Sequence, residues 1–76
     1  MIDLAAMRRA AGITQVELAD NLGVGQAQIS KLERQSDMLI STLAAYLEAL
    51  GANAYVVVEM GEQTVRYELT SSRGTR

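Results

Sequence analysis

The sequence predicts a mostly α-helical fold that ends in a small β element. Apolar residues recur three and four positions apart through residues 1–50, which is the helical period. Residues 54–70 are instead rich in β-forming residues, and their second half alternates strictly. The length of 76 residues bounds the chain to one small domain. The change of period therefore divides this domain near Gly51 into a helical part and a β-hairpin.

The first two helices are bounded by recognisable start and stop signals. The opening helix begins at Asp3, an acidic start, and stops at Gly12. Thr14 and Glu17 form a capping-box pattern, in which each side chain accepts a hydrogen bond from the other residue's backbone amide. The turn at 23–25 contains two glycines and ends the second helix.

A third helix is expected at about residues 26–34, with Ile29 and Leu32 facing inward. A fourth helix follows the connection 35–39 and closes at Gly51, in the C-cap position. Its apolar stripe consists of Ile40, Leu43, Leu47 and Leu50. Met38 and Leu39 either pack on this helix or form an exposed patch for a partner.

The β element is predicted to be a hairpin centred on Glu62, with a turn at 61–63. This register pairs Tyr55 with Leu69 and Val57 with Tyr67. It places one set of residues on a common face: Tyr55, Val57, Val65, Tyr67 and Leu69. A lone two-stranded hairpin is marginal in water, so another surface must cover it. The stretch from Thr70 to Arg76 is polar and is predicted to be frayed.

The composition excludes several classes of function. The chain has no Cys and no His, which excludes a thiol nucleophile, a Ser–His pair, a disulfide framework and an ordinary zinc site. We therefore predict no metal or cofactor and no enzymatic activity. Apolar residues make up 49% of the chain, too many for a disordered segment. No apolar run approaches the roughly 18–20 residues of a membrane span.

Residues 14–34 carry the functional signal. They form two short helices joined by a glycine turn, and the second helix has amide and basic side chains near its start. Such a helix fits the major groove of DNA with its N-terminal residues toward the base edges. Gln suits recognition of adenine, and Lys suits guanine or phosphate.

The segments 12–19, 22–26 and 29–34 resemble the lambda-repressor-like, Cro/CI-type (XRE) helix-turn-helix family over about residues 4–51. The resemblance implies a domain of four to five helices with the third helix as recognition helix. It implies a DNA-binding domain at 1–51, whereas the uncovered hairpin at 52–70 is expected to be a dimerisation element and the polar segment 71–76 a flexible tail. It also implies contacts to DNA, with Gln15 on a phosphate, Gln26 on a base and Ala27 on a methyl group. The full set of expected DNA-binding residues is Thr14, Gln15, Gln26, Ala27, Gln28, Ser30, Lys31 and Arg34. Arg8 and Glu33 map onto a structural salt bridge of the family.

Two features depart from the family pattern. Residue 25 is glycine where a small hydroxyl residue is frequent, so the recognition helix loses a side-chain cap. The connection 36–39 lacks the basic residues that often meet the DNA backbone. The basic residues among positions 1–50 are Arg8, Arg9, Lys31 and Arg34, and acidic residues outnumber them. Since cations supply nonspecific affinity for DNA, we expect that affinity to be weak.

The resemblance further implies a homodimeric repressor that acts in the bacterial cytoplasm at the nucleoid. The hairpins of two chains would join into one four-stranded sheet. The expected interface residues are Tyr55, Val56, Val57, Val58, Val65, Tyr67 and Leu69. The two recognition helices would then lie about 34–36 Å apart, which suits a palindromic operator.

The compact domain followed directly by a strand also resembles antitoxin regulators of the HigA and HipB type. That resemblance implies repression of the chain's own operon and a toxin partner, either a RelE- or HigB-like ribonuclease or a HipA-like kinase. An acidic antitoxin suits a basic toxin, and the formal charge of this chain is −2. Two alternatives stay open: a free-standing repressor of phage or metabolic type, and a protein-interaction or inhibitor module with vestigial DNA binding.

Overall fold

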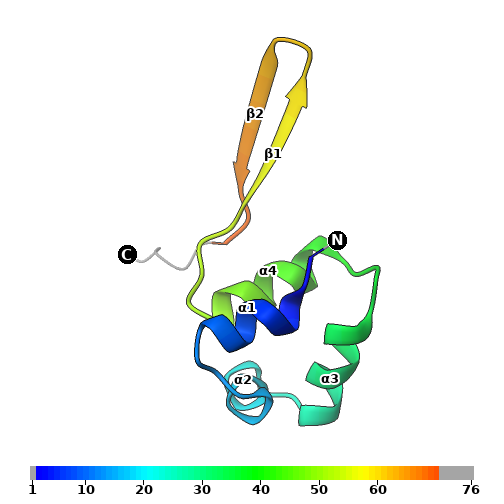
Figure 1. Cartoon of the computed structure of the whole chain (residues 1–76), viewed down its shortest axis with the longest axis vertical. Helices are drawn as coiled ribbons and strands as arrows, with labels where there is room; N and C mark the ends of the chain where they lie inside the picture. The colour runs from blue at the N-terminus through cyan, green and yellow to red at the C-terminus, as the bar shows by residue number, and fades with distance from the viewer. Residues whose placement is uncertain (1, 71–76) are drawn as a thin grey trace.

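The computed structural model describes residues 2–70 and contains four helices followed by one antiparallel hairpin (Figure 1). The helices are α1 (Leu4–Ala10), α2 (Gln15–Leu22), α3 (Gln26–Arg34) and α4 (Ile40–Ala49), and the strands are β1 (Tyr55–Met60) and β2 (Gln63–Glu68). The predicted mostly helical fold with a C-terminal hairpin is confirmed. The expected tail at 71–76 lies outside the described residues. No helix within residues 2–70 is long and apolar enough to cross a membrane.

Local hydrogen bonds define the helix ends, as the sequence predicts. The Asp3 carboxylate accepts from the Ala6 amide at the start of α1. At the start of α2, the Thr14 hydroxyl accepts from the Glu17 amide at 3.1 Å, and the Glu17 carboxylate accepts from the Thr14 amide at 2.9 Å. The capping box is therefore complete. Gly23 ends α2 with a φ of 73°, a left-handed conformation that glycine adopts without a steric penalty.

The core is small and lies among the four helices. Its fully buried or nearly buried apolar residues are Leu4, Leu18, Ala19, Ile29, Tyr46 and Leu47. Tyr46 is its largest member, and its hydroxyl oxygen lies 3.1 Å from the Leu4 carbonyl oxygen. Met38 packs against this core, whereas Leu39 is 72% exposed. Of the two possibilities for these residues, packing on the helices therefore applies to Met38 and exposure at the surface applies to Leu39.

The predicted strand register is wrong by one residue. The turn has two residues, Gly61 and Glu62, and β1 pairs with β2 so that Val56 lies opposite Tyr67 and Val58 opposite Val65. Gly61 has a φ of 59° and Glu62 does not have a positive φ, and a positive φ at only the first of two turn residues is the arrangement of a type II′ turn. A shift of one residue transfers side chains to the opposite face. The predicted common face of Tyr55, Val57, Val65, Tyr67 and Leu69 is therefore not formed.

The observed register instead separates an apolar face from a polar face. The first, which we call the apolar hairpin face, consists of Val56, Val58, Met60, Val65 and Tyr67. The opposite face carries Tyr55 and Val57 among charged residues, and the Arg66 guanidinium lies 4.1 Å from the centre of the Tyr55 ring. Both faces are largely open to solvent.

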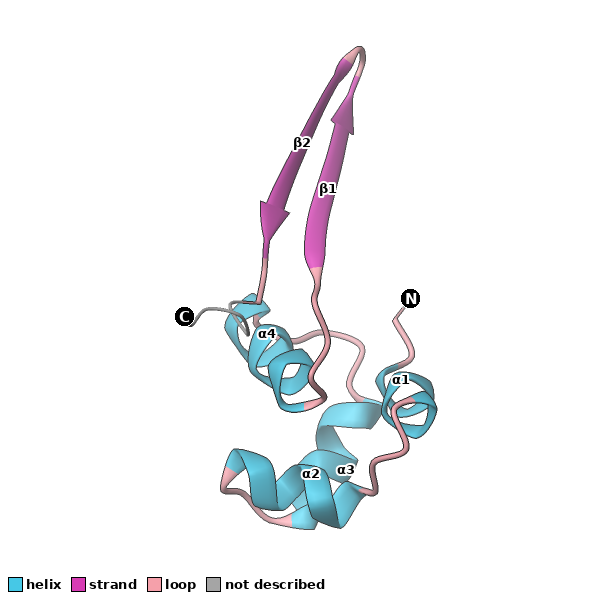
Figure 2. Cartoon of the chain, turned by 90° about the vertical axis from the view of Figure 1, so that its left-hand side faces the viewer, coloured by secondary structure: helices cyan, strands magenta, loops and turns pink. Residues whose placement is uncertain are grey.

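The hairpin leaves the end of α4 and points away from the four helices (Figures 1 and 2). Its base is held by two hydrogen bonds, from the Leu69 amide to the Ala54 carbonyl and from the Ala54 amide to the Thr70 hydroxyl. Thr70 is only 2% exposed, so the prediction that fraying begins at this residue is wrong. The reason is that its hydroxyl satisfies a backbone amide beneath the hairpin.

Candidate nucleic-acid interface

The outer face of α3 presents most of the predicted DNA-binding side chains to solvent. Ile29 is fully buried against the core, so the opposite side of the helix is free. The exposed residues there are Gln26, Ala27, Gln28, Lys31 and Arg34, and Ser30 is half-buried. Arg34 donates to the Ser30 hydroxyl at 2.9 Å, which holds its guanidinium along the helix. The face thus combines amide donors and acceptors with two cations.

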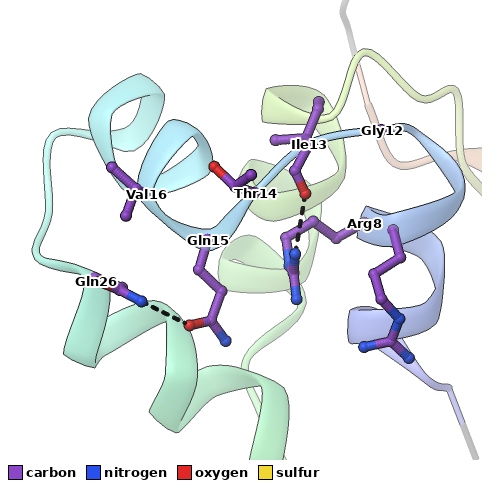
Figure 3. Close-up of a pocket in the computed structure, with 8 residues that line it drawn as sticks. Arg8, Gly12, Ile13, Thr14, Gln15, Val16 and Gln26 are labelled. Atoms are coloured by element: carbon purple, nitrogen blue, oxygen red, sulfur yellow. Dashed lines mark hydrogen bonds between the residues drawn. The ribbon is translucent and has the colours of Figure 1, made fainter.

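The starts of α2 and α3 meet at the edge of this face. The side-chain amide nitrogen of Gln26 donates to the side-chain carbonyl oxygen of Gln15 at 3.2 Å (Figure 3). Both residues are the first of their helices, and Thr14 caps the helix that Gln15 opens. The fold therefore brings Gln26 to the adjacent residues Thr14 and Gln15, although Gln26 follows Gln15 by eleven positions in the sequence.

A shallow hollow of about 420 Å³ lies beside the start of α2 (Figure 3). Its lining consists of Arg8, Arg9, Gly12, Ile13, Thr14, Gln15, Val16 and Gln26. Arg9 was not among the predicted site residues, although its basic side chain directly before the turn to α2 was a usable signal. The hollow joins this cation to the N-terminal amides of α2, which carry the positive end of the helix dipole.

Both helix starts keep backbone amides without intrahelical acceptors. In α2 the capping box uses the amides of Thr14 and Glu17, whereas those of Gln15 and Val16 belong to the unsatisfied first turn. In α3 the N-cap is Gly25, which supplies no side-chain hydrogen bond, as its identity predicted. Amides of this kind can bind a phosphate oxygen.

A buried ionic cluster supports the interface from behind. The Arg8 Nε lies 2.6 Å from Glu33 Oε2, and the same carboxylate oxygen accepts from the Tyr46 hydroxyl at 2.6 Å. The Arg8 Nη1 also donates to the Ile13 carbonyl oxygen at 2.9 Å. Arg8 and Glu33, paired by the family resemblance, are thus in contact, and the cluster connects α1, α3 and α4.

These contacts keep the two charged groups ionised and the phenol neutral. Burial by itself raises the pKa of Glu33, but hydrogen bonds from Arg8, Tyr46 and Gln15 outweigh it, so the pKa lies below its ordinary value. The hydrogen bond to Glu33 raises the pKa of Arg8 against the opposing effect of burial. Burial raises the pKa of Tyr46, and its hydrogen bond to Glu33 acts in the same direction. Glu33 is therefore an acceptor only.

A family model described as helix-turn-helix matches residues 4–55, and this range contains all four helices. The chain belongs to the helix-turn-helix family. As in the pattern that names this family, α2 and α3 are the two helices on either side of the turn, and the Gln15–Gln26 contact joins them.

Two curated proteins are similar to most of the chain. It is 45% identical over 71 residues to the HigA3 protein of Mycobacterium tuberculosis, a match that covers 90% of this chain and 63% of that relative. It is 37% identical over 76 residues to antitoxin HigA1 of the same species, covering 95% of this chain and 51% of the relative. The chain thus spans about half to two thirds of the length of these curated relatives.

Two solved structures have a similar fold. The first is described as DNA-bound antitoxin HigA3, with a TM-score of 0.79, 42% identity, and coverage of 87% of this chain and 88% of that chain. The second is described as induced DNA bending by unique dimerization of HigA antitoxin, with a TM-score of 0.76, 42% identity and the same coverage.

Proposed function

We propose that the chain is a sequence-specific, double-stranded-DNA-binding regulator of transcription. The observation that carries this proposal is the exposed outer face of α3, which begins at the Gln15–Gln26 pair. Gln26 has a free carbonyl oxygen and a free N–H to offer to a base edge, a combination that suits adenine in the major groove. The likeness to a DNA-bound HigA structure at 42% identity supports the same role.

Phosphate contacts come from the two helix starts. Arg9 and the first amides of α2 surround the hollow, and the amides that open α3 follow an uncapped glycine. Because these groups supply local positive potential, the surface can bind the DNA backbone although the chain has a net charge of −2. Lys31 and Arg34 add cations along the recognition helix, Gln28 is exposed in its first turn, and Thr14 caps the neighbouring helix α2.

The regulator acts as a homodimer whose contact is the apolar hairpin face. Met60 and Tyr67 on that face are 52% and 62% exposed, although both are large and apolar. Four of the residues predicted for the interface lie there: Val56, Val58, Val65 and Tyr67. Met60 is added to them, whereas Tyr55 and Val57 lie on the polar side and Leu69 sits at the base. The description of the HigA structure as dimeric supports this assembly.

The biological role that fits best is that of a type II antitoxin, which represses its own operon and neutralises a toxin. HigA-type antitoxins are the relatives at 37–45% identity, and the acidic chain suits a basic toxin such as a RelE- or HigB-like ribonuclease. Such a protein would act in the bacterial cytoplasm, at the chromosome. A free-standing repressor would bind the operator without a toxin.

Two measurements test these roles separately. Selection from a random pool of duplex DNA, with wild type and Gln26→Ala side by side, tests specific binding. Gentle purification of the tagged protein from its source cells, followed by native mass spectrometry, tests the partner. Recovery of a second, basic protein in fixed stoichiometry supports the antitoxin role, and a homodimer alone supports the free-standing repressor. Absence of any enriched DNA sequence would instead leave a protein-interaction module.

A further inference from the structure

A continuous chain of hydrogen bonds runs from the buried core to the base-reading position. Tyr46 and the Arg8 Nε both donate to Glu33 Oε2, whereas Oε1 accepts from Gln15 Nε2 at 3.0 Å and, at the longer distance of 3.3 Å, from Arg8 Nη2. Gln15 Oε1 in turn accepts from Gln26 Nε2 at 3.2 Å. The carboxylate side chain is only 5% exposed, so it lies behind the interface and out of reach of DNA. We call the links from Glu33 through Gln15 to Gln26 the amide relay.

The direction of every link in the amide relay follows from its first member. An ionised carboxylate can only accept hydrogen bonds, so Gln15 must turn its NH₂ group toward Glu33. The carbonyl oxygen of Gln15 then faces the other way and can only accept, so Gln26 must donate. Gln26 is left with its own carbonyl oxygen and one N–H. An adenine presents the complementary pair, an N7 acceptor and an N6 donor, on its major-groove edge.

We infer that Glu33 is a positioning residue for base recognition, which sets the orientation of the Gln26 amide through Gln15. This inference rests on the proposed function, since it concerns how the same surface selects a base. Arg8 and Tyr46 hold the carboxylate in place from α1 and α4, so its orientation is fixed before DNA arrives. Fixing a long polar side chain in advance lowers the entropic cost of ordering it on binding.

The variant Glu33→Gln reverses the amide relay. Its side-chain oxygen takes the place of Oε2, which accepts the two shortest bonds, from Arg8 Nε and Tyr46, so its NH₂ group faces Gln15 and gives up the longer contact with Arg8 Nη2. Gln15 must then present its oxygen to residue 33 and its NH₂ to Gln26, and Gln26 must accept. Its two N–H groups are now free, and two donors suit the O6 and N7 acceptors of guanine. The base preferred at this one position should shift from adenine toward guanine.

The measurement is the ratio of affinities for the selected operator and for the same duplex with guanine replacing the adenine read by Gln26. This ratio is insensitive to uniform losses of affinity. Gln15→Met removes both side-chain hydrogen bonds of residue 15 and leaves the ion pair of Arg8 and Glu33 in place. The Gln26 side chain is then free before binding and must be ordered to read the adenine, so the ratio should fall about 2- to 12-fold. Glu33→Gln should lower the ratio by at least as much. Gln15→Met serves alone if Glu33→Gln fails to fold.

Tyr46→Phe is the matched control, because it removes one hydrogen bond from Oε2 and leaves the Gln15 contact with Oε1 in place. It should lower stability and keep the wild-type ratio. An unchanged ratio in Gln15→Met, or an equal change in Tyr46→Phe, would overturn the inference while leaving DNA binding intact. A wild type without any base preference would instead remove the proposed function itself. If Gln26→Ala keeps the ratio, Gln26 does not read the base and the inference is also wrong.

Discussion

Aspartate at position 58 tests whether the apolar hairpin face is the dimer contact. Val58 is 39% exposed in the single chain and lies opposite Val65 on that face. A fully buried valine contributes about 1.5–3 kcal/mol, so covering the exposed part of Val58 by a partner is worth about 1 kcal/mol per copy. An unpaired carboxylate in the same place costs about 2 kcal/mol more. Two-fold symmetry doubles both effects to about 6 kcal/mol, which weakens the dimer on the order of 10⁴-fold.

Val57→Asp is the control for this change, since the substitution is identical and only the face differs. Val57 is 54% exposed and lies opposite Arg66 on the polar side of the hairpin. A carboxylate there gains a cross-strand partner of opposite charge, worth about 0.2–1 kcal/mol. The dimer of this variant should therefore persist.

Sedimentation velocity over a range of concentrations measures the dimer dissociation constant of both variants. Far-ultraviolet circular dichroism checks that the helices stay folded, as their core lies apart from the hairpin. The reasoning is refuted if Val58→Asp dissociates no more readily than wild type, or if both variants dissociate equally. The second result would assign the contact to the strand edge or to the opposite face.

The remaining predictions concern the helical part. Gln26→Ala should cost about 1–3 kcal/mol of specific operator binding in a mobility-shift titration with the fold intact, and an unchanged affinity would contradict the assignment of this residue. Thr14→Ala should lower the free energy of unfolding in urea by about 1 kcal/mol because it removes half of the capping box, whereas Thr14→Ser should stay near wild type. Since the pKa of Glu33 is lowered, its contribution to stability is complete above its ordinary value of 4.5 and is lost as pH falls through the folded-state pKa. The pKa of Tyr46 is raised, so its contribution is complete below 10.0 and is lost at higher pH. Urea titrations across pH measure the contributions of Glu33 and Tyr46 to the free energy of unfolding. If Tyr46→Phe lost as much stability at high pH as wild type does, the prediction for Tyr46 would be wrong.

The helix boundaries could be predicted from the sequence because local chemistry determines them. Thr14 and Glu17 are three residues apart, and their mutual hydrogen bonds need nothing from the rest of the chain. The end of the second helix at the glycine turn 23–25 is also determined locally, because Gly23 adopts a positive φ. The bounds predicted for the third helix agree with α3 for the same reason.

The hairpin register could not be read in the same way. Residues 55–58 are apolar at four successive positions, so the first strand has no alternation to show which side is covered. The register therefore depends on the length of the turn, and the sequence fits a turn of two residues almost as well as one of three. The choice of two residues moved Val57 to the polar side and gathered Met60 with Val58.

The contacts behind the interface were also beyond local reasoning, because they join distant parts of the chain. Gln15 and Glu33 are eighteen positions apart, and Tyr46 and Leu4 are forty-two apart. The sequence pattern supplied the pair of Arg8 and Glu33 only through the family resemblance. That Tyr46 completes the cluster follows from the packing of α4 on the other helices, which the apolar stripe of that helix does not specify.

The position of Glu33 explains why so small a core contains a buried charge. A buried ion pair is weak support for stability, and well-packed apolar residues often serve as well. Glu33 lies on α3, and it accepts hydrogen bonds from Arg8 on α1, Gln15 on α2 and Tyr46 on α4. One carboxylate therefore links its own helix to the other three. Apolar packing tolerates small slips between helices, whereas these directed bonds fix the orientation of α2 against α3, on which the proposed reading of a base edge depends.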